Sequence, residues 1–270
     1  MRRQDRSGCA IRSDPMTSSP EIRVLAASQQ LFQAAAEQFV NEAKQAVNQR
    51  GRFTVALSGG STPKGLYTLL AGPFQSQVPW QRTFFFWGDE RHVPPDHPDS
   101  NYRMVNEAMF SRVAVPRENI FRVPAETPDA DLVALEYEET IRHFFQLEPG
   151  ACPRFDLVLL GMGPDGHTAS LFPGSAALQK NSRLAVANWI EKFKTYRITF
   201  TLPVINNAAC VIFLIAGEDK ADALHEVLGT DSEGEKFPAK LIHPAHGRLI
   251  FYIDRAVAAH LSIATQPKAG

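Results

Sequence analysis

A histidine and an aspartate lie two residues apart just after an apolar segment. Residues 155–160 read Phe-Asp-Leu-Val-Leu-Leu, and the glycine-rich turn that follows contains Asp165 and His167. An imidazole can accept a proton near neutral pH, so His167 is a candidate general base. Asp165 could bind a substrate or bias the charge of the imidazole. A histidine that only caps or packs is the alternative, but the flanking glycines and the position after a predicted strand favour catalysis.

We expect His167 to lie near the start of a helix. The positive end of a helix dipole favours the neutral imidazole that a base requires. This expectation depends on the backbone conformation of the segment 161–174, which begins Gly-Met-Gly-Pro-Asp-Gly-His-Thr.

A second segment has the composition of an anion-binding loop. Residues 57–63 read Leu-Ser-Gly-Gly-Ser-Thr-Pro and lead from a predicted strand toward a predicted helix. Glycines let the backbone curl around an anion, and hydroxyls and a helix N-terminus add donors. The spacing is not that of the nucleotide P-loop. The candidate ligands of a phosphate or a sugar are Ser58, Gly59, Gly60, Ser61 and Thr62, although an ordinary strand-to-helix turn would have the same composition.

A third segment, 88–92, reads Gly-Asp-Glu-Arg-His and follows the apolar segment 83–87. Arg91 offers a rigid fork for a phosphate or a carboxylate. Asp89 could accept hydrogen bonds from substrate hydroxyls or hold Arg91. The alternative is a solvated turn whose charges pair with one another, and for Glu90 and His92 the two interpretations stay open.

Two basic residues, Lys194 and Arg197, lie three positions apart before another apolar segment. They could hold a phosphate from the side opposite the glycine loop. Without further information, solvated positive charges on a loop are the simpler interpretation.

The elements that must position these residues alternate between strand-like and helix-like patterns. Apolar spacing predicts helices from Ser28 to about Asn48 and over 130–146. The second helix is expected to have Leu132, Leu135, Ile141 and Phe145 on one side. Strands are expected at 53–57, 83–87, 155–160, 184–187, 197–202, 210–215 and 249–253. This alternation predicts an α/β fold: an open, mostly parallel, Rossmann-like sheet with helices on both faces.

In a parallel sheet the loops after the strands emerge at one edge, where ligands bind. The loops 58–62, 88–92 and 161–167 are therefore expected to meet at a single site. We predict one domain over residues 21–266, preceded by a disordered tail over residues 1–20, which is rich in Arg, Ser and Pro.

Composition excludes several classes of function. The chain has 28 Lys plus Arg and 29 Asp plus Glu, and its net charge of −1 does not indicate a nucleic-acid-binding protein. No apolar run approaches the roughly 18 residues that span a bilayer. The cysteines form no zinc knuckle, and the histidine pairs lack zincin spacing. We expect a cytoplasmic protein, a monomer or a weak homodimer, with no metal, cofactor, nucleic-acid or membrane partner.

Five segments of the chain together resemble the 6-phosphogluconolactonases, in the superfamily that includes glucosamine-6-phosphate deaminases. They occur in the family's order, and the resemblance extends over nearly all of residues 22–260. The segments are 57–63, 87–91, 100–102, 161–174 and 197–203. The resemblance implies the sugar-phosphate isomerase/deaminase/lactonase fold. It also implies hydrolysis of 6-phospho-D-glucono-1,5-lactone to 6-phospho-D-gluconate, a step of the oxidative pentose phosphate pathway, without a metal.

The resemblance further implies roles for individual residues. His167 would be the base that activates water. The phosphate would be bound by the 58–62 loop, Arg91, Lys194 and Arg197. For Lys194 and Arg197, the resemblance thus favours phosphate binding over solvated charges on a loop.

Two alternatives are a glucosamine-6-phosphate deaminase or isomerase and a non-catalytic sugar-phosphate-binding protein. The sister deaminases have a glutamate where this chain has Phe172 and a tyrosine where it has Arg91. Both differences favour the lactonases. A sensor would usually have a DNA-binding module, and no basic helix-turn-helix segment is visible.

Overall fold

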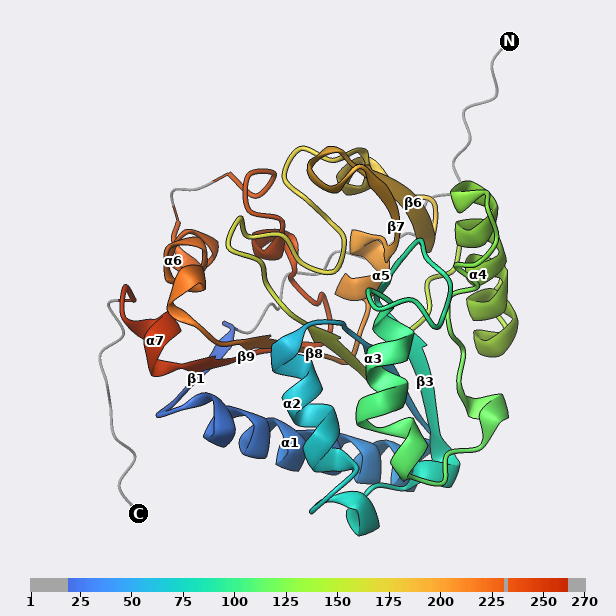
Figure 1. Cartoon of the computed structure of the whole chain (residues 1–270), viewed down its shortest axis with the longest axis horizontal. Coiled ribbons are helices and arrows are strands. Elements are labelled where there is room, and N and C mark those ends of the chain that lie inside the picture. The colour runs from blue at the N-terminus through green and yellow to red at the C-terminus, as the bar shows by residue number, and fades with distance from the viewer. Residues whose placement is uncertain (1–18, 231–232, 262–270) are drawn as a thin grey trace.

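The computed structural model describes residues 19–230 and 233–261 (Figure 1). The disordered tail expected over residues 1–20 falls almost entirely outside these ranges. Residues 262–266, the end of the expected domain, also lie outside them.

A six-stranded parallel sheet forms the centre of the fold. Parallel strands that are covered on both faces need apolar side chains on both, and β2, β5 and β8 are buried at every position. The strand order is β1-β9-β8-β5-β2-β3. The strands are β1 (Glu21–Leu25), β9 (Arg248–Asp254), β8 (Cys210–Ile215), β5 (Leu157–Leu160), β2 (Phe53–Leu57) and β3 (Thr83–Trp87). The parallel sheet predicted from the alternation of elements is confirmed.

A smaller antiparallel sheet contains β4 (Asp89–Arg91), β7 (Thr195–Phe200) and β6 (Ala185–Ile190), in the order β4-β7-β6. The expectation of a loop over 88–92 is therefore wrong for three of its residues. Charged residues rarely indicate a strand, but β4 is formed by pairing with β7, which lies about a hundred residues later in the chain. In this register Arg91 lies opposite Arg197.

Helices cover the parallel sheet. In Figure 1, α1 and α2 lie below β8 and β9, whereas α5 and α6 lie above them. The helices are α1 (Ser28–Arg50), α2 (Ser61–Leu70), α3 (Asn101–Ala108), α4 (Ala130–Phe145), α5 (Leu202–Asn206), α6 (Ala221–Leu228) and α7 (Arg255–Ala258). Within the described ranges, none of them combines the length and hydrophobicity needed to cross a bilayer.

The apolar side predicted for α4 is wrong in part. Leu132 and Leu135 are each 42% exposed, whereas Ile141 is buried as expected. Val133 and Tyr137, which the prediction did not include, are also buried. The helix packs on β6 and β7, and Val133, Tyr137 and Ile141 also recur at helical spacing. The sequence of α4 is compatible with two overlapping apolar faces, and packing against β6 and β7 determines which of them is buried.

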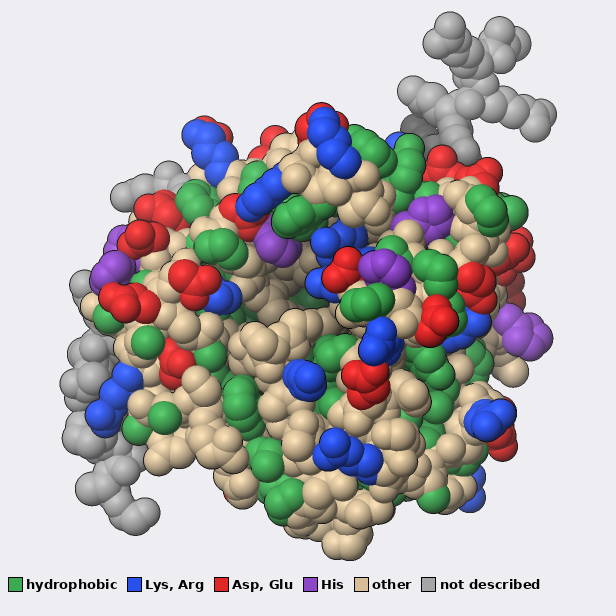
Figure 2. All heavy atoms as spheres, in the orientation of Figure 1, with side chains coloured by type: hydrophobic (Ala, Val, Ile, Leu, Met, Phe, Trp, Pro, Cys, Tyr) green, Lys and Arg blue, Asp and Glu red, His purple; other side chains and the backbone are tan. Residues whose placement is uncertain are grey.

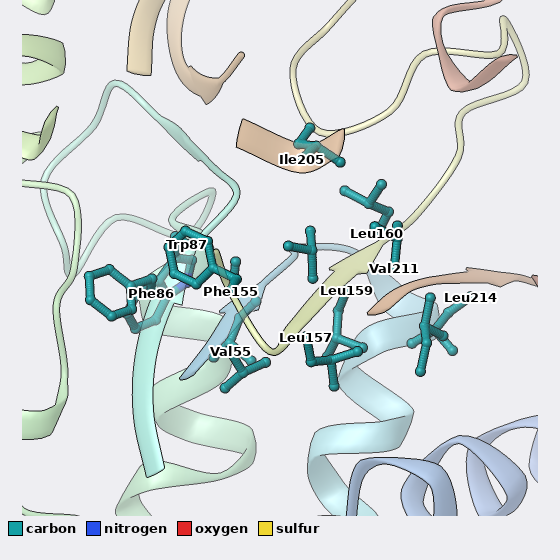
Figure 3. Packing of buried hydrophobic residues seen from close by; sticks show 14 of the residues in the cluster. Val55, Phe86, Trp87, Phe155, Leu157, Leu159, Leu160, Ile205, Val211 and Leu214 are labelled. Atoms are coloured by element: carbon teal, nitrogen blue, oxygen red, sulfur yellow. The ribbon is translucent and has the colours of Figure 1, made fainter. Parts of the chain in front are cut away.

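Side chains from neighbouring strands pack tightly at the middle of the sheet (Figure 3). Val55 of β2, Leu159 of β5 and Val211 of β8 are at most 1% exposed. Such close-packed strands hold their ends in fixed positions, so the loops that leave them begin from a rigid base.

Candidate functional site

The chain changes direction across the sheet at β2. It passes from β2 to β3 on one side, and then returns to β5, β8 and β9 on the other side. The carboxyl ends of β2 and β5 thus flank a topological switch point, where ligands bind in open α/β sheets. The segments that follow them, 58–62 and 161–167, are two of the three expected site loops.

A pocket of about 170 Å³ lies at this edge, and most of the residues expected to bind substrate line it. Figure 2 shows a hollow in this face, with Lys or Arg side chains on two sides and a histidine at its rim. The predicted residues that line the pocket are Ser58, Gly59, Gly60, Ser61, Thr62, Asp89, Arg91, His167 and Arg197. Sequence segments more than a hundred residues apart therefore meet at one site.

Asp165 and His167 form a hydrogen-bonded pair. Nδ1 of His167 lies 2.5 Å from Oδ1 of Asp165, which also accepts the backbone N–H of His167 at 3.2 Å. Burial alone would raise the pKa of Asp165, but the hydrogen bond and the charge of the imidazole outweigh it and lower the pKa to about 2. An ionised Asp165 keeps a proton on Nδ1, which leaves Nε2 to accept another.

His167 does not lie at the start of a helix, contrary to the expectation. The segment from Gly161 to Thr168 contains no helical residues and is closed by its own hydrogen bonds. The N–H of Gly163 donates to the carbonyl of His167 at 2.9 Å, and Oγ1 of Thr168 donates to the carbonyl of Gly161 at 2.8 Å. The carboxylate of Asp165, rather than a helix dipole, is thus the main electrostatic neighbour of the imidazole.

Two residues fix the plane of the imidazole. The ring of Phe172 stacks on it, with centroids 4.1 Å apart and an interplanar angle of 17°. On the backbone side, a Cβ at Gly163 would lie 2.1 Å from Cε1 of His167. Only glycine leaves room for the ring at that position.

Asp89 connects two of the site loops. It is 6% exposed, and its Oδ2 accepts a hydrogen bond of 2.7 Å from the buried hydroxyl of Ser170. Its backbone carbonyl accepts the side-chain amide of Asn101 at 2.9 Å. The same amide group lies so close to Gly59 that a Cβ there would be 1.9 Å from Oδ1 of Asn101. Asp89 therefore lines the pocket from a tightly held position.

Glu90 points away from the pocket and holds the start of α3. Its carboxylate accepts the backbone N–H groups of Arg91, Asn101 and Tyr102 at 2.7–2.8 Å. Burial raises the pKa of Glu90, and the three backbone hydrogen bonds oppose that rise. The open question about Glu90 is thus answered by a structural contact.

Two arginines that line the pocket have hydrogen-bond donors without a partner. The buried Nε atoms of Arg91 and Arg197, and the hydroxyl of Ser58, have no hydrogen-bond partner among the described residues. Burial, and next the charge of Arg91, lower the pKa of Arg197. Bringing two cations together with unused donors is costly unless an anion lies between them. The arrangement suits a phosphate.

Lys194 lies outside the lining of the pocket. Its side chain is 70% exposed and pairs with Glu191 on the turn between β6 and β7. Another cation lines the pocket instead: Lys220, at the end of the short 3-10 helix Glu218–Lys220 that follows β8. The sequence analysis missed it, although Gly217 directly after an apolar strand was a usable signal of a loop at the same edge.

Comparison with known proteins agrees with this geometry. The family model of glucosamine-6-phosphate isomerases/6-phosphogluconolactonase matches residues 26–251. The chain belongs to this family. The family resemblance seen in the sequence motifs is therefore confirmed.

Several family members named 6-phosphogluconolactonase are similar to the chain. The protein from Nostoc sp. (strain PCC 7120) is 46% identical over 218 residues, which cover 81% of this chain and 88% of that protein. The protein from Synechocystis sp. (strain PCC 6803) is 42% identical over 243 residues, with 90% and 99% covered. The solved structure of 6-phosphogluconolactonase from Trypanosoma brucei is 30% identical, with a TM-score of 0.82 over 90% of this chain and 99% of that one.

Proposed function

We propose that this chain hydrolyses 6-phospho-D-glucono-1,5-lactone to 6-phospho-D-gluconate, with His167 as the general base. The observation that carries the proposal is the joint placement of an Asp-paired imidazole and a cluster of cations in one pocket. The names of similar family members support the same substrate.

The phosphate is held at the cationic part of the pocket. Arg91, Arg197 and Lys220 supply the charge, and the segment 58–62, which includes the start of α2, supplies hydroxyl and backbone donors. The guanidinium groups of Arg91 and Arg197 line the pocket and are suited to the oxygens of a phosphate. We assign no contact to Lys194 because it does not line the pocket.

Anchoring the phosphate places C1 of the lactone near His167. Nε2 takes a proton from water as the water oxygen bonds to the carbonyl carbon, and a tetrahedral oxyanion forms. When that oxyanion collapses, the bond between C1 and the ring oxygen breaks. The imidazolium returns its proton to this oxygen, which becomes a hydroxyl. A positioned base contributes about 10²- to 10⁴-fold to such a rate.

Asp165 and Asp89 have different roles in this scheme. Asp165 keeps the proton on Nδ1 and stabilises the imidazolium that forms during the attack. Asp89, which is held by Ser170, accepts hydrogen bonds from sugar hydroxyls.

Hydrolysis is favoured over deamination by Phe172. Its ring covers a face of the imidazole at the position where the deaminases have a glutamate, so it brings no second acid to that place. Arg91 also replaces the tyrosine of the deaminases.

The direct test is an assay of the purified chain with two substrates. We expect acid release from freshly prepared 6-phospho-D-glucono-1,5-lactone well above the spontaneous rate, and no ammonia from glucosamine 6-phosphate. Ammonia release would support the deaminase alternative. Tight binding of the lactone without turnover would indicate a sugar-phosphate-binding protein.

A further inference from the structure

An aromatic ring outside the pocket contacts Arg197 at its cationic end and Phe172, which packs on the base. Phe193 lies in the turn Glu191–Phe193 between β6 and β7 and is 46% exposed. The guanidinium carbon of Arg197 lies over its ring, 5.3 Å from the centroid. The edge of the ring meets Phe172, with centroids 6.0 Å apart. We infer that Phe193 is a positioning residue for Arg197 and thereby sets the affinity of the site for the phosphate of its substrate.

The stacking leaves the donors of Arg197 available. A guanidinium attracted to the face of a ring is held by its charge, so the N–H groups at its edge stay free. Nε of Arg197 is buried and has no hydrogen-bond partner among the described residues. The ring of Phe193 can therefore hold the cation in place without competing for the hydrogen bonds that a phosphate needs.

Arg197 needs such a partner because its neighbour in the sheet repels it. Arg91 lies opposite it across β4 and β7. In the absence of an anion, repulsion between the two cations favours rotamers that turn Arg197 out of the pocket. The ring of Phe193, over which Nζ of Lys192 also lies, attracts the guanidinium and offsets this repulsion, which makes the site ready for a phosphate before it binds.

Phe172 also connects Phe193 to the proposed general base, His167. Phe172 stacks on His167, so Phe193, Phe172 and the imidazole are in consecutive contact. Other exposed aromatics of this hairpin are placed differently: the rings of Trp189 and Tyr196 pack on each other, 5.0 Å apart, and Trp189 lines no part of the pocket. Trp189 thus provides a matched control.

The test rests on the proposed function and compares two lactones. Phe193→Ala should raise KM for 6-phospho-D-glucono-1,5-lactone about 3- to 10-fold, the range of a partly buried cation–π contact. Inhibition by inorganic phosphate should weaken by the same factor, and kcat should change less than about twofold. Hydrolysis of D-glucono-1,5-lactone, which has no phosphate, should keep its kcat/KM.

Further variants distinguish the effect of the aromatic face of Phe193 from the effect of its side-chain volume. Phe193→Tyr should retain the wild-type KM because it keeps the aromatic face, whereas Phe193→Leu should resemble Phe193→Ala. Trp189→Ala should behave as the wild type. Equal losses on both lactones, a wild-type KM in Phe193→Leu, or the same KM rise in Trp189→Ala would overturn the inference.

The variant Arg197→Ala distinguishes a failure of the role inferred for Phe193 from a failure of the proposed function. If Arg197→Ala raises KM for the phosphorylated lactone and Phe193→Ala does not, only the role of Phe193 is wrong. If Arg197→Ala leaves KM unchanged, both the phosphate assignment and the role of Phe193 are wrong.

Discussion

The position of the His167 imidazole depends on the missing side chain at Gly163. A Cβ added there would lie 2.1 Å from Cε1 and 2.2 Å from Nδ1 of the ring. Gly163→Ala should therefore displace the base and lower kcat by about 10²-fold, the cost of a misplacement of about 1 Å. The affinity for 6-phosphogluconate should change little. Steady-state kinetics and product inhibition measure the two effects.

Gly88→Ala is the control for this substitution. Its added Cβ would approach only the carbonyl oxygen of Leu57, at 3.6 Å, which is ordinary contact. An equal loss of kcat in the two variants would mean that the packing around Gly163 does not set the position of the base.

The charge of Asp165 gives a prediction about pH. Because its pKa is lowered to about 2, the stabilising pairing is complete above an aspartate's ordinary pKa of about 4 and is lost only as pH falls through about 2. Asp165 therefore stays ionised in mildly acidic solution. Asp165→Asn should lower kcat about 10- to 100-fold, since a hydrogen bond to a charged group is lost.

The affinity for 6-phosphogluconate should change little in Asp165→Asn, because this carboxylate contacts the base and not the cationic part of the pocket. An unchanged kcat in this variant would contradict the proposed role of Asp165.

The sequence revealed most of these site residues because strand ends and glycines mark them. It did not reveal Lys220, whose importance comes from the position of β8 beside β5. Nor did it separate Lys194 from Arg197. The αL conformation at Lys194, with φ of 49°, turns the chain just before β7, and this depends on the hairpin as a whole.

At the level of elements, Glu90 connects β4 to the start of α3. Glu90→Ala would leave three backbone N–H groups, of buried and half-buried residues, without their acceptor, so we expect a loss of about 2–4 kcal/mol in the free energy of unfolding. The melting temperature should fall by roughly 4–10 °C. Urea and thermal unfolding measure these losses.

Glu107→Ala, in α3, is the control for Glu90→Ala. Glu107 is 55% exposed, and its ion pair with Arg103 should contribute little to stability. Equal stabilities of the two variants would show that Glu90 does not anchor α3.

The elements differ in how well the sequence predicts them. The buried strands β2, β3, β5 and β8 could be predicted, because a short run of apolar residues bounded by glycine usually forms a buried strand in an α/β chain. β4 could not, since its Asp-Glu-Arg sequence becomes a strand only when β7 is beside it. The buried face of α4 likewise depends on its contact with β6 and β7.

At the scale of the whole molecule, the pocket joins the ends of four parallel strands, so a ligand there should stabilise the fold. At 100 times its Kd, 6-phosphogluconate should add about 2.7 kcal/mol to the free energy of unfolding and raise the melting temperature by about 5 °C. D-gluconate at the same concentration should have almost no effect, since it lacks the phosphate. Scanning fluorimetry measures both shifts.

The Arg91→Ala/Arg197→Ala double variant should lose most of the shift caused by 6-phosphogluconate. An undiminished shift would mean that the phosphate binds elsewhere on the molecule.

The measurement closest to the central claim is the turnover of His167→Asn on fresh 6-phospho-D-glucono-1,5-lactone, corrected for spontaneous hydrolysis. Asparagine keeps a polar side chain but cannot accept the proton of water, so kcat should fall by about 10²- to 10⁴-fold while 6-phosphogluconate still binds with near wild-type affinity. A variant that retains near wild-type kcat would contradict the assignment of His167 as the base.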